Sequence, residues 1–151
     1  MVPRLESPPS TLWRYGFKVA EKRYFTLHQA NEVLPAVRAL AERMVAHRQA
    51  LNEAHERYRV FAEKIAGNGG GLNPREFGAV QEQIELEAAG VARCIDGIHE
   101  LGGIVKDLED GLVDFLARRG EEDVLLCWQV GEERITHWHG LEEGFSGRKP
   151  L

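Results

Sequence analysis

The stretch GNGGGLNPRE, from Gly67 to Glu76, decides the fold expected for this chain. Its glycine-rich first half ends a helix, because glycine is a poor helix former and is favoured just past a helix end. Asn73 is a preferred N-cap residue and Pro74 suits a first helical position, so a second helix begins there. Two helices joined by so short a connection form an antiparallel hairpin.

The apolar residues on both sides of this loop follow a helical spacing. They recur in steps of three and four from Val37 to Ile65, and again from Phe77 to Leu101. This rhythm is typical of a packed helical seam. Thr26–Gln29 has the form of a capping box at the start of the first helix. Pro35 lacks a backbone N–H, so we expect a kink or restart near Leu34.

Two polar residues, His47 and Glu87, occupy seam positions where apolar residues are expected. In an antiparallel hairpin they lie about one turn apart. The spacing favours a hydrogen bond between them that fixes the register of the two helices, rather than a pair of metal ligands.

After Gly103 the hydrophobic period changes from about 3.6 to 2, which indicates strands. The expected strands are 104–106, 112–115, 124–130 and 135–139, with turns at 107–111, 118–123 and 131–134. The fold class is therefore α+β, with a long antiparallel helical hairpin followed by a small antiparallel β-meander.

The chain is expected to hold one domain over residues 24–151, with the hairpin in 24–102 and the meander and C-terminal tail in 103–151. Residues 1–23 contain three prolines and little to bury, which predicts an extended or disordered leader. Trp13, Tyr15 and Phe17 alternate along this leader, so a short docked strand is the alternative.

Composition excludes several classes of protein. The chain has 151 residues and a net charge of -5, and its basic residues form no patch in the sequence, which argues against nucleic-acid binding. No apolar run is long enough to cross a bilayer, and we expect no membrane association. No secretory signal is evident, so a cytoplasmic location with reduced Cys94 and Cys127 is expected.

The lengths of the elements predict a partner. A helix over residues 35–66 would run about 48 Å, whereas a four-stranded meander is only about 19 Å wide. Part of the helical seam is then left uncovered, and we expect a homodimer to bury it as a bundle. A related alternative is a metal-free module that contacts another protein through the hairpin.

The C-terminal sequence ITHWHGLEE suggests a metal site. On a strand, His137 and His139 project from the same face, and Glu142 reaches back if the chain turns at Gly140. Cys127 joins them if the preceding loop has three residues, which would place it across from His137. The simpler interpretation is an edge strand with surface histidines and solvated glutamates.

Several short motifs together resemble a known family. They are Tyr24-Phe25-Thr26-Leu27, Gly111-Leu112-Val113-Asp114-Phe115, Leu126-Cys127-Trp128, Trp138-His139 and Gly144-Phe145-Ser146-Gly147-Arg148. Over roughly residues 24–151 the chain resembles the domain-of-unknown-function 2203 family, whose members are described as candidate metal-binding proteins. The resemblance implies a site at His139 and Glu142, with Asp114 nearby.

The combined expectation is a divalent transition metal, Zn, Ni or Fe. His139 and Glu142 would be the central ligands, with His137 next and Asp114 either a ligand or a residue that supports one. A metal-dependent hydrolase or lyase would also need a general base, for which Glu132 and Glu143 are the candidates. Nothing in the sequence specifies a reaction.

Overall fold

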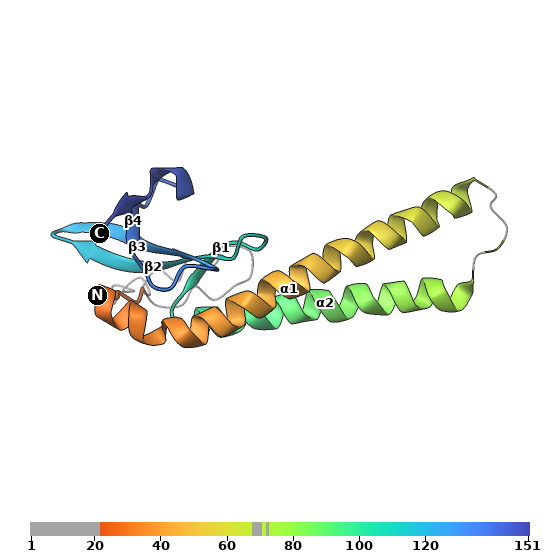
Figure 1. The fold of residues 1–151 in the computed structure, drawn as a ribbon, viewed down its shortest axis with the longest axis horizontal. Coiled ribbons are helices and arrows are strands. Elements are labelled where there is room, and N and C mark those ends of the chain that lie inside the picture. The colour runs from red at the N-terminus through yellow and green to blue at the C-terminus, as the bar shows by residue number, and fades with distance from the viewer. Residues whose placement is uncertain (1–21, 68–70, 72) are drawn as a thin grey trace, which may run out of the picture.

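The computed structural model describes residues 22–67, 71 and 73–151, in which a long helical hairpin precedes an antiparallel sheet (Figure 1). The elements are α1 (Leu27–Ala66), α2 (Pro74–Glu100), β1 (Ile104–Asp107), β2 (Leu112–Arg119), β3 (Glu122–Gln129), β4 (His137–Gly140), the 3-10 helix η1 (Phe145–Gly147) and β5 (Lys149–Pro150). The predicted α+β class, with a hairpin followed by a meander, is confirmed. All but the last two residues of the predicted leader lie outside the described residues.

Both helices begin at the predicted caps. The Thr26 side chain accepts a hydrogen bond from the Gln29 N–H, and the Gln29 side chain accepts one from the Thr26 N–H. This reciprocal pair satisfies two donors that a helix start leaves free. At α2, Asn73 Oδ1 accepts a hydrogen bond from the Arg75 N–H, and Pro74 takes the first helical position.

Of the two outcomes expected at Pro35, the structure shows a change of direction and not a restart (Figure 1). α1 runs without interruption from Leu27 to Ala66 and contains Pro35. Its first turns point in a different direction from the rest of the helix (Figure 1), as a proline inside a helix would cause. Leu34 and Val37 on either side are buried, and their packing offsets the hydrogen bond that proline cannot make.

The predicted contact between His47 and Glu87 is confirmed. His47 Nδ1 lies 2.6 Å from Glu87 Oε2, and the Gln83 amide donates to the other carboxylate oxygen. Gly90 of α2 makes room for the imidazole, because a Cβ at this position would lie 2.6 Å from His47 Nδ1. The polar pair and the glycine together fix how α1 and α2 lie against each other.

Gly90→Ala is therefore expected to lower the free energy of unfolding by about 1–3 kcal/mol, because the new methyl group displaces the His47 ring. Gly78→Ala on the same helix is the matched control, since a Cβ there meets nothing within 4 Å. It should instead raise stability by about 0.5–1 kcal/mol through helix propensity. Urea unfolding of both variants measures the contrast. Equal effects would show that the His47 contact does not constrain the hairpin.

The sheet has the strand order β1-β2-β3-β4-β5, with every neighbouring pair antiparallel. The predicted turn over 118–123 is wrong, because β2 and β3 remain paired up to Arg119 and Glu122. Only Gly120 and Glu121 form the turn. Gly120 has a φ of 65°, which an L side chain rarely adopts, and this conformation permits a tighter turn than expected.

One face of the sheet packs on the helices. Phe115 and Trp128 are fully buried on this face, in one cluster with helical residues such as Leu34 and Ile98. Side chains alternate along a strand, so Asp114 and Cys127 project from the other face. The start of the domain is held to the sheet by the Phe25 N–H, which donates to the Leu116 carbonyl at 2.7 Å.

The hairpin extends beyond the sheet (Figure 1). The last buried residue of α1 is Ala54, and apolar side chains such as Tyr58, Ile65 and Leu86 are exposed farther along. The predicted homodimer would cover this part and stays a prediction, as does the module alternative. Neither helix in the described part of the chain is long and apolar enough to span a membrane.

Candidate metal centre

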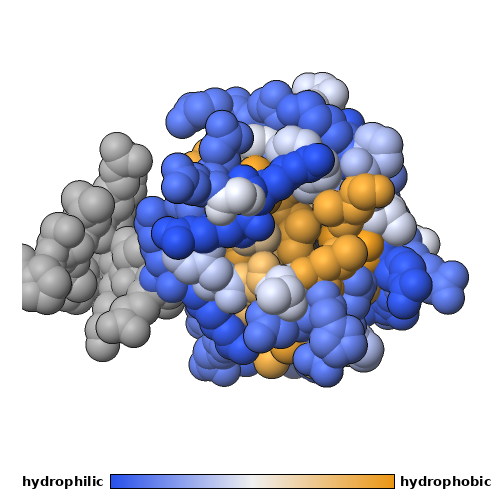
Figure 2. All heavy atoms as spheres, turned by 90° about the vertical axis from the view of Figure 1, so that its left-hand side faces the viewer, coloured by the Kyte–Doolittle hydropathy of each residue, from blue (hydrophilic) through white to orange (hydrophobic). Residues whose placement is uncertain are grey.

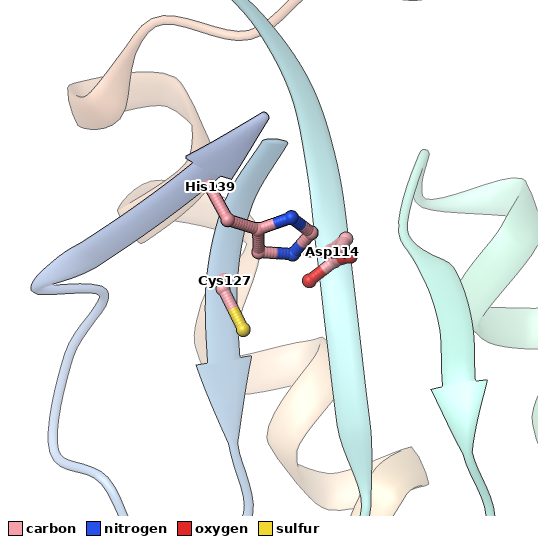
Figure 3. A group of neighbouring side chains, drawn as sticks. All are labelled: Asp114, Cys127 and His139. Carbon is pink, nitrogen blue, oxygen red and sulfur yellow. Dashed lines mark hydrogen bonds and ion pairs between the residues drawn. The ribbon is translucent and has the colours of Figure 1, made fainter. Parts of the chain in front are cut away.

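Three strands bring a carboxylate, a thiol and an imidazole together on the sheet face that points away from the helices. Asp114 of β2 pairs with Cys127 of β3, and Cys127 pairs with His137 of β4. His139 lies two residues farther along β4, across from Leu125. Its ring reaches back over β3, so that Asp114, Cys127 and His139 point toward one another (Figure 3).

One potential ligand atom from each of these side chains lies within 4.8 Å of the other two. His139 Nε2 is 3.0 Å from Asp114 Oδ2. All three residues are buried, with exposed fractions of 1% for Asp114, 2% for Cys127 and 3% for His139. Among the described residues, this is the one such cluster of three.

The backbone sets the tautomer of His139. Its Nδ1 lies 2.8 Å from the carbonyl oxygen of Gly140, which can only accept a hydrogen bond. Nδ1 therefore carries a proton, and Nε2 is the nitrogen that faces Asp114. Two lone pairs at 3.0 Å would repel each other, so either a proton or a metal ion must lie between Nε2 and the carboxylate.

Burial opposes negative charge at this site. It raises the pKa of Asp114 above its ordinary value, and the nearby His139 only partly offsets that effect. Burial also raises the pKa of Cys127 to about 12, with a further contribution from the charge of Asp114. The second carboxylate oxygen, Asp114 Oδ1, is buried without a hydrogen-bond partner. A cation would relieve all of these costs at once.

The same features exclude an activated cysteine nucleophile. A reactive thiol needs a lowered pKa and a nearby base, whereas the pKa of Cys127 is raised. His139 cannot act as that base, because one ring nitrogen contacts Gly140 and the other contacts Asp114. The cluster therefore has residue types that could hold a metal ion, and it lacks the features of an activated cysteine.

The three potential ligand atoms lie within 4.8 Å of one another, close to the spacing of ligands around one metal ion. Nitrogen, oxygen and sulfur ligands of one zinc ion stand roughly 3.5 Å apart. Side-chain movements of about 1 Å would bring the three atoms to this spacing. A metal-bound histidine ordinarily donates its other N–H to a carbonyl or carboxylate, and His139 already does so to Gly140.

The structure separates the four ligands predicted from sequence into two groups. Asp114 and His139 are in contact, whereas His137 and Glu142 lie outside the cluster. The Nδ1 of His137 is 2.9 Å from the hydroxyl of Thr136, and its side chain is partly exposed. Glu142 is exposed in the turn that follows β4.

Both candidate general bases are held in other contacts. Glu132 pairs with Arg148 at 2.6 Å and accepts a hydrogen bond from the Gln129 N–H. Glu143 accepts a hydrogen bond from the Gly140 N–H and pairs with Lys149. The Gly140 hydrogen bond, and after it Lys149, hold the pKa of Glu143 below its ordinary value. These contacts fasten the C-terminal segment beside the cluster, where Arg148 also donates to the Cys127 carbonyl.

Sequence reasoning treated Cys127 only as an optional ligand. The register that it required, with Cys127 across from His137, is confirmed. The contact with Asp114 was missed because the register of β2 and β3 was not considered. The predicted turn over 118–123 has the same centre as the observed turn at Gly120 and Glu121, and either one places Asp114 directly across from Cys127.

A family model described as "Uncharacterized conserved protein (DUF2203)" matches residues 23–151. This range includes the whole hairpin, the sheet and all three clustered residues. Neither the curated proteins nor the solved structures contain a significant match to the chain.

Proposed function

The chain belongs to the DUF2203 family of uncharacterised conserved proteins, and within it we propose that Asp114, Cys127 and His139 bind a divalent transition metal ion. Sulfur, nitrogen and oxygen ligands in a tetrahedral arrangement favour zinc over harder ions such as magnesium or calcium. Nickel and iron are the next candidates, since imidazole also suits both.

The observation that carries this proposal is the buried Asp114–His139 contact with its fixed tautomer. The Gly140 carbonyl keeps the proton on Nδ1, and so directs the Nε2 lone pair toward the carboxylate and the thiol. Asp114 Oδ1 has no partner of its own. A metal ion would bind the lone pairs that this arrangement brings together, and it would neutralise the carboxylate and a thiolate in a buried site.

Three protein ligands leave a fourth tetrahedral position. In catalytic zinc sites this position holds water or substrate, whereas structural sites fill it with a fourth side chain. His137 is the nearest predicted ligand along β4, since it pairs with Cys127 across the sheet. To become the fourth ligand, His137 would have to change its rotamer.

The alternative is a metal-free hydrogen-bonded cluster, in which a single proton joins His139 to Asp114. The Cys127 thiol is then the neighbouring donor for the carboxylate, and a thiol is a weak hydrogen-bond donor. The proposal and this alternative differ in metal content, which is measured directly.

Untagged protein is expected to contain or take up one zinc ion per chain, measured by elemental mass spectrometry. His139→Ala should lose this metal, because it removes the one nitrogen that faces the other two ligands. His137→Ala is the matched control on the same strand and should retain it. Glu142→Gln should retain it as well.

Cobalt substitution identifies the ligands independently. Cobalt bound to a cysteine thiolate gives a ligand-to-metal charge-transfer absorption, which should be present in the unmodified chain and in His137→Ala. Folded protein that takes up no zinc, nickel, iron or cobalt would overturn the proposal. Loss of metal in His137→Ala or Glu142→Gln would return the site to the ligands predicted from sequence.

A further inference from the structure

An apolar pocket lies at the end of the molecule where the described chain begins. It has a volume of about 570 Å³, within the usual range for ligand-binding cavities. Apolar residues of the helix start and of three strands line it, including Leu27, Ala117, Leu126 and Trp138. Figure 2 shows this hollow as an apolar patch surrounded by polar side chains.

The pocket is separate from the proposed metal site. Leu126 and Trp138 pack with the helix-facing core, whereas Asp114 and His139 lie on the opposite face of the sheet. Arg118 and Arg119 lie at the pocket, and each stacks on an aromatic ring, Tyr24 and Trp138 respectively. The centre of the lining is thus apolar and aromatic, and the two arginines at the pocket already stack on aromatic rings.

We propose that this pocket is a docking site for the N-terminal segment of the same chain, through the alternating aromatic residues Trp13, Tyr15 and Phe17. These side chains share one face of an extended segment, as a row of apolar anchors would. The family match begins at residue 23, so the segment lies outside the part of the chain that the family model covers.

The position of the chain favours this occupant over a separate molecule. The described residues begin at Lys22, and Tyr24, Phe25, Thr26 and Leu27 already form one wall of the pocket. Phe17 lies five positions before Lys22 in the sequence, a separation of about 17 Å when the chain is extended. A segment tethered this closely has an effective concentration on the order of millimolar, so even weak apolar contacts fill the site.

The sequence of the segment matches the lining in character. Trp13, Tyr15, Phe17 and Val19 alternate with Arg14, Gly16 and Lys18. The lining offers aromatic rings for edge or offset contacts, which favour aromatic partners beyond their area alone. Docking would remove both apolar surfaces from water, and would make the segment part of the domain instead of a leader.

Photo-crosslinking in the full-length chain tests the proposal. Phe17 or Trp13 is replaced by p-benzoylphenylalanine, and the crosslinked peptides are identified by mass spectrometry. The expected result is a crosslink within one chain to peptides that contain Ala117, Leu126 or Trp138. A mixture of isotope-labelled and unlabelled protein distinguishes crosslinks within a chain from those between chains.

A pocket variant and a matched control complete the design. Leu27→Glu places a carboxylate in the pocket at the first turn of α1, where the helix dipole favours an acid, so the fold should be retained. It should lower the crosslink yield about tenfold or more, because the pocket would have to bury an unpaired charge. Leu86→Glu, an exposed position on α2, should leave the yield unchanged.

Crosslinks that form only between labelled and unlabelled chains would overturn the proposal in favour of a second copy in the pocket. An absence of pocket peptides, or a yield that Leu27→Glu does not lower, would overturn it as well. The metal content of the protein is not expected to change in any of these variants. Failure of this inference is thus distinguishable from failure of the proposed metal site.

Discussion

Cys127→Ser is expected to lower the zinc affinity of the protein by at least about 100-fold, since even residues that only support a ligand contribute 10- to 100-fold. The thiolate is the one soft ligand of the cluster, and a serine hydroxyl is a poor substitute because it does not ionise near neutral pH. Competition with a chromophoric zinc chelator measures the affinity. The cobalt charge-transfer absorption should disappear in the same variant.

Cys94→Ser provides the matched control. Both cysteines are free and 2% exposed, but Cys94 lies on α2 in the helical core. Its substitution also places a hydroxyl in a buried site, so it reproduces the cost in stability without touching the cluster. An equal loss of zinc affinity in the two variants would show that the effect comes from weakened folding, and that Cys127 is not a ligand.

Zinc affinity is expected to rise steeply with pH, by about 10- to 100-fold per pH unit between about pH 6 and pH 8, because binding displaces one or two protons. One proton comes from the Cys127 thiol, whose raised pKa of about 12 keeps it protonated over this range. The second is the proton that lies between His139 Nε2 and Asp114 Oδ2 in the metal-free protein, at the pH values where it is present. Calorimetry in buffers with different ionisation enthalpies counts the protons released.

Cys127→Ser should reduce this count by one proton, whereas Cys94→Ser should not change it. An affinity that does not vary with pH would contradict binding through the thiolate and the imidazole. Metal-free protein should show the opposite trend in stability, because the pKa of Asp114 is raised above its ordinary value of 3.8. The contribution of the Asp114 carboxyl to stability is fully present below pH 3.8, and it is lost as the pH rises through the raised pKa of the folded protein.

Local sequence was enough to predict much of the hairpin. The caps at Thr26 and Asn73 depend on side chains within a few residues of the helix start, and both formed as expected. The contact of His47 with Glu87 followed from the position of the loop, since helical geometry fixes which residues face each other. The sequence left open whether Pro35 would bend or restart the helix, because the packing that offsets its local cost comes from the core.

The candidate site shows the limit of such reasoning. His139 and Asp114 were recognised as ligand types, but their contact crosses β3 and depends on two hairpin registers at once. The pairing of Asp114 with Cys127 follows from a turn centred between Gly120 and Glu121, but the position of His139 over that pair does not follow from this turn. Glu142 was expected to reach back to the site, and the fold instead leaves it exposed beside the Gly140–Glu143 turn.

The sequence by itself therefore determined the helical hairpin, the presence of an antiparallel sheet and the chemical types of residue available to a site. These features follow from periodicity, capping and turn chemistry, which act over a few residues. Only the tertiary structure decided which of those residues meet. A contact between strands depends on the register of each turn and on which face the core buries, and these are properties of the assembled sheet.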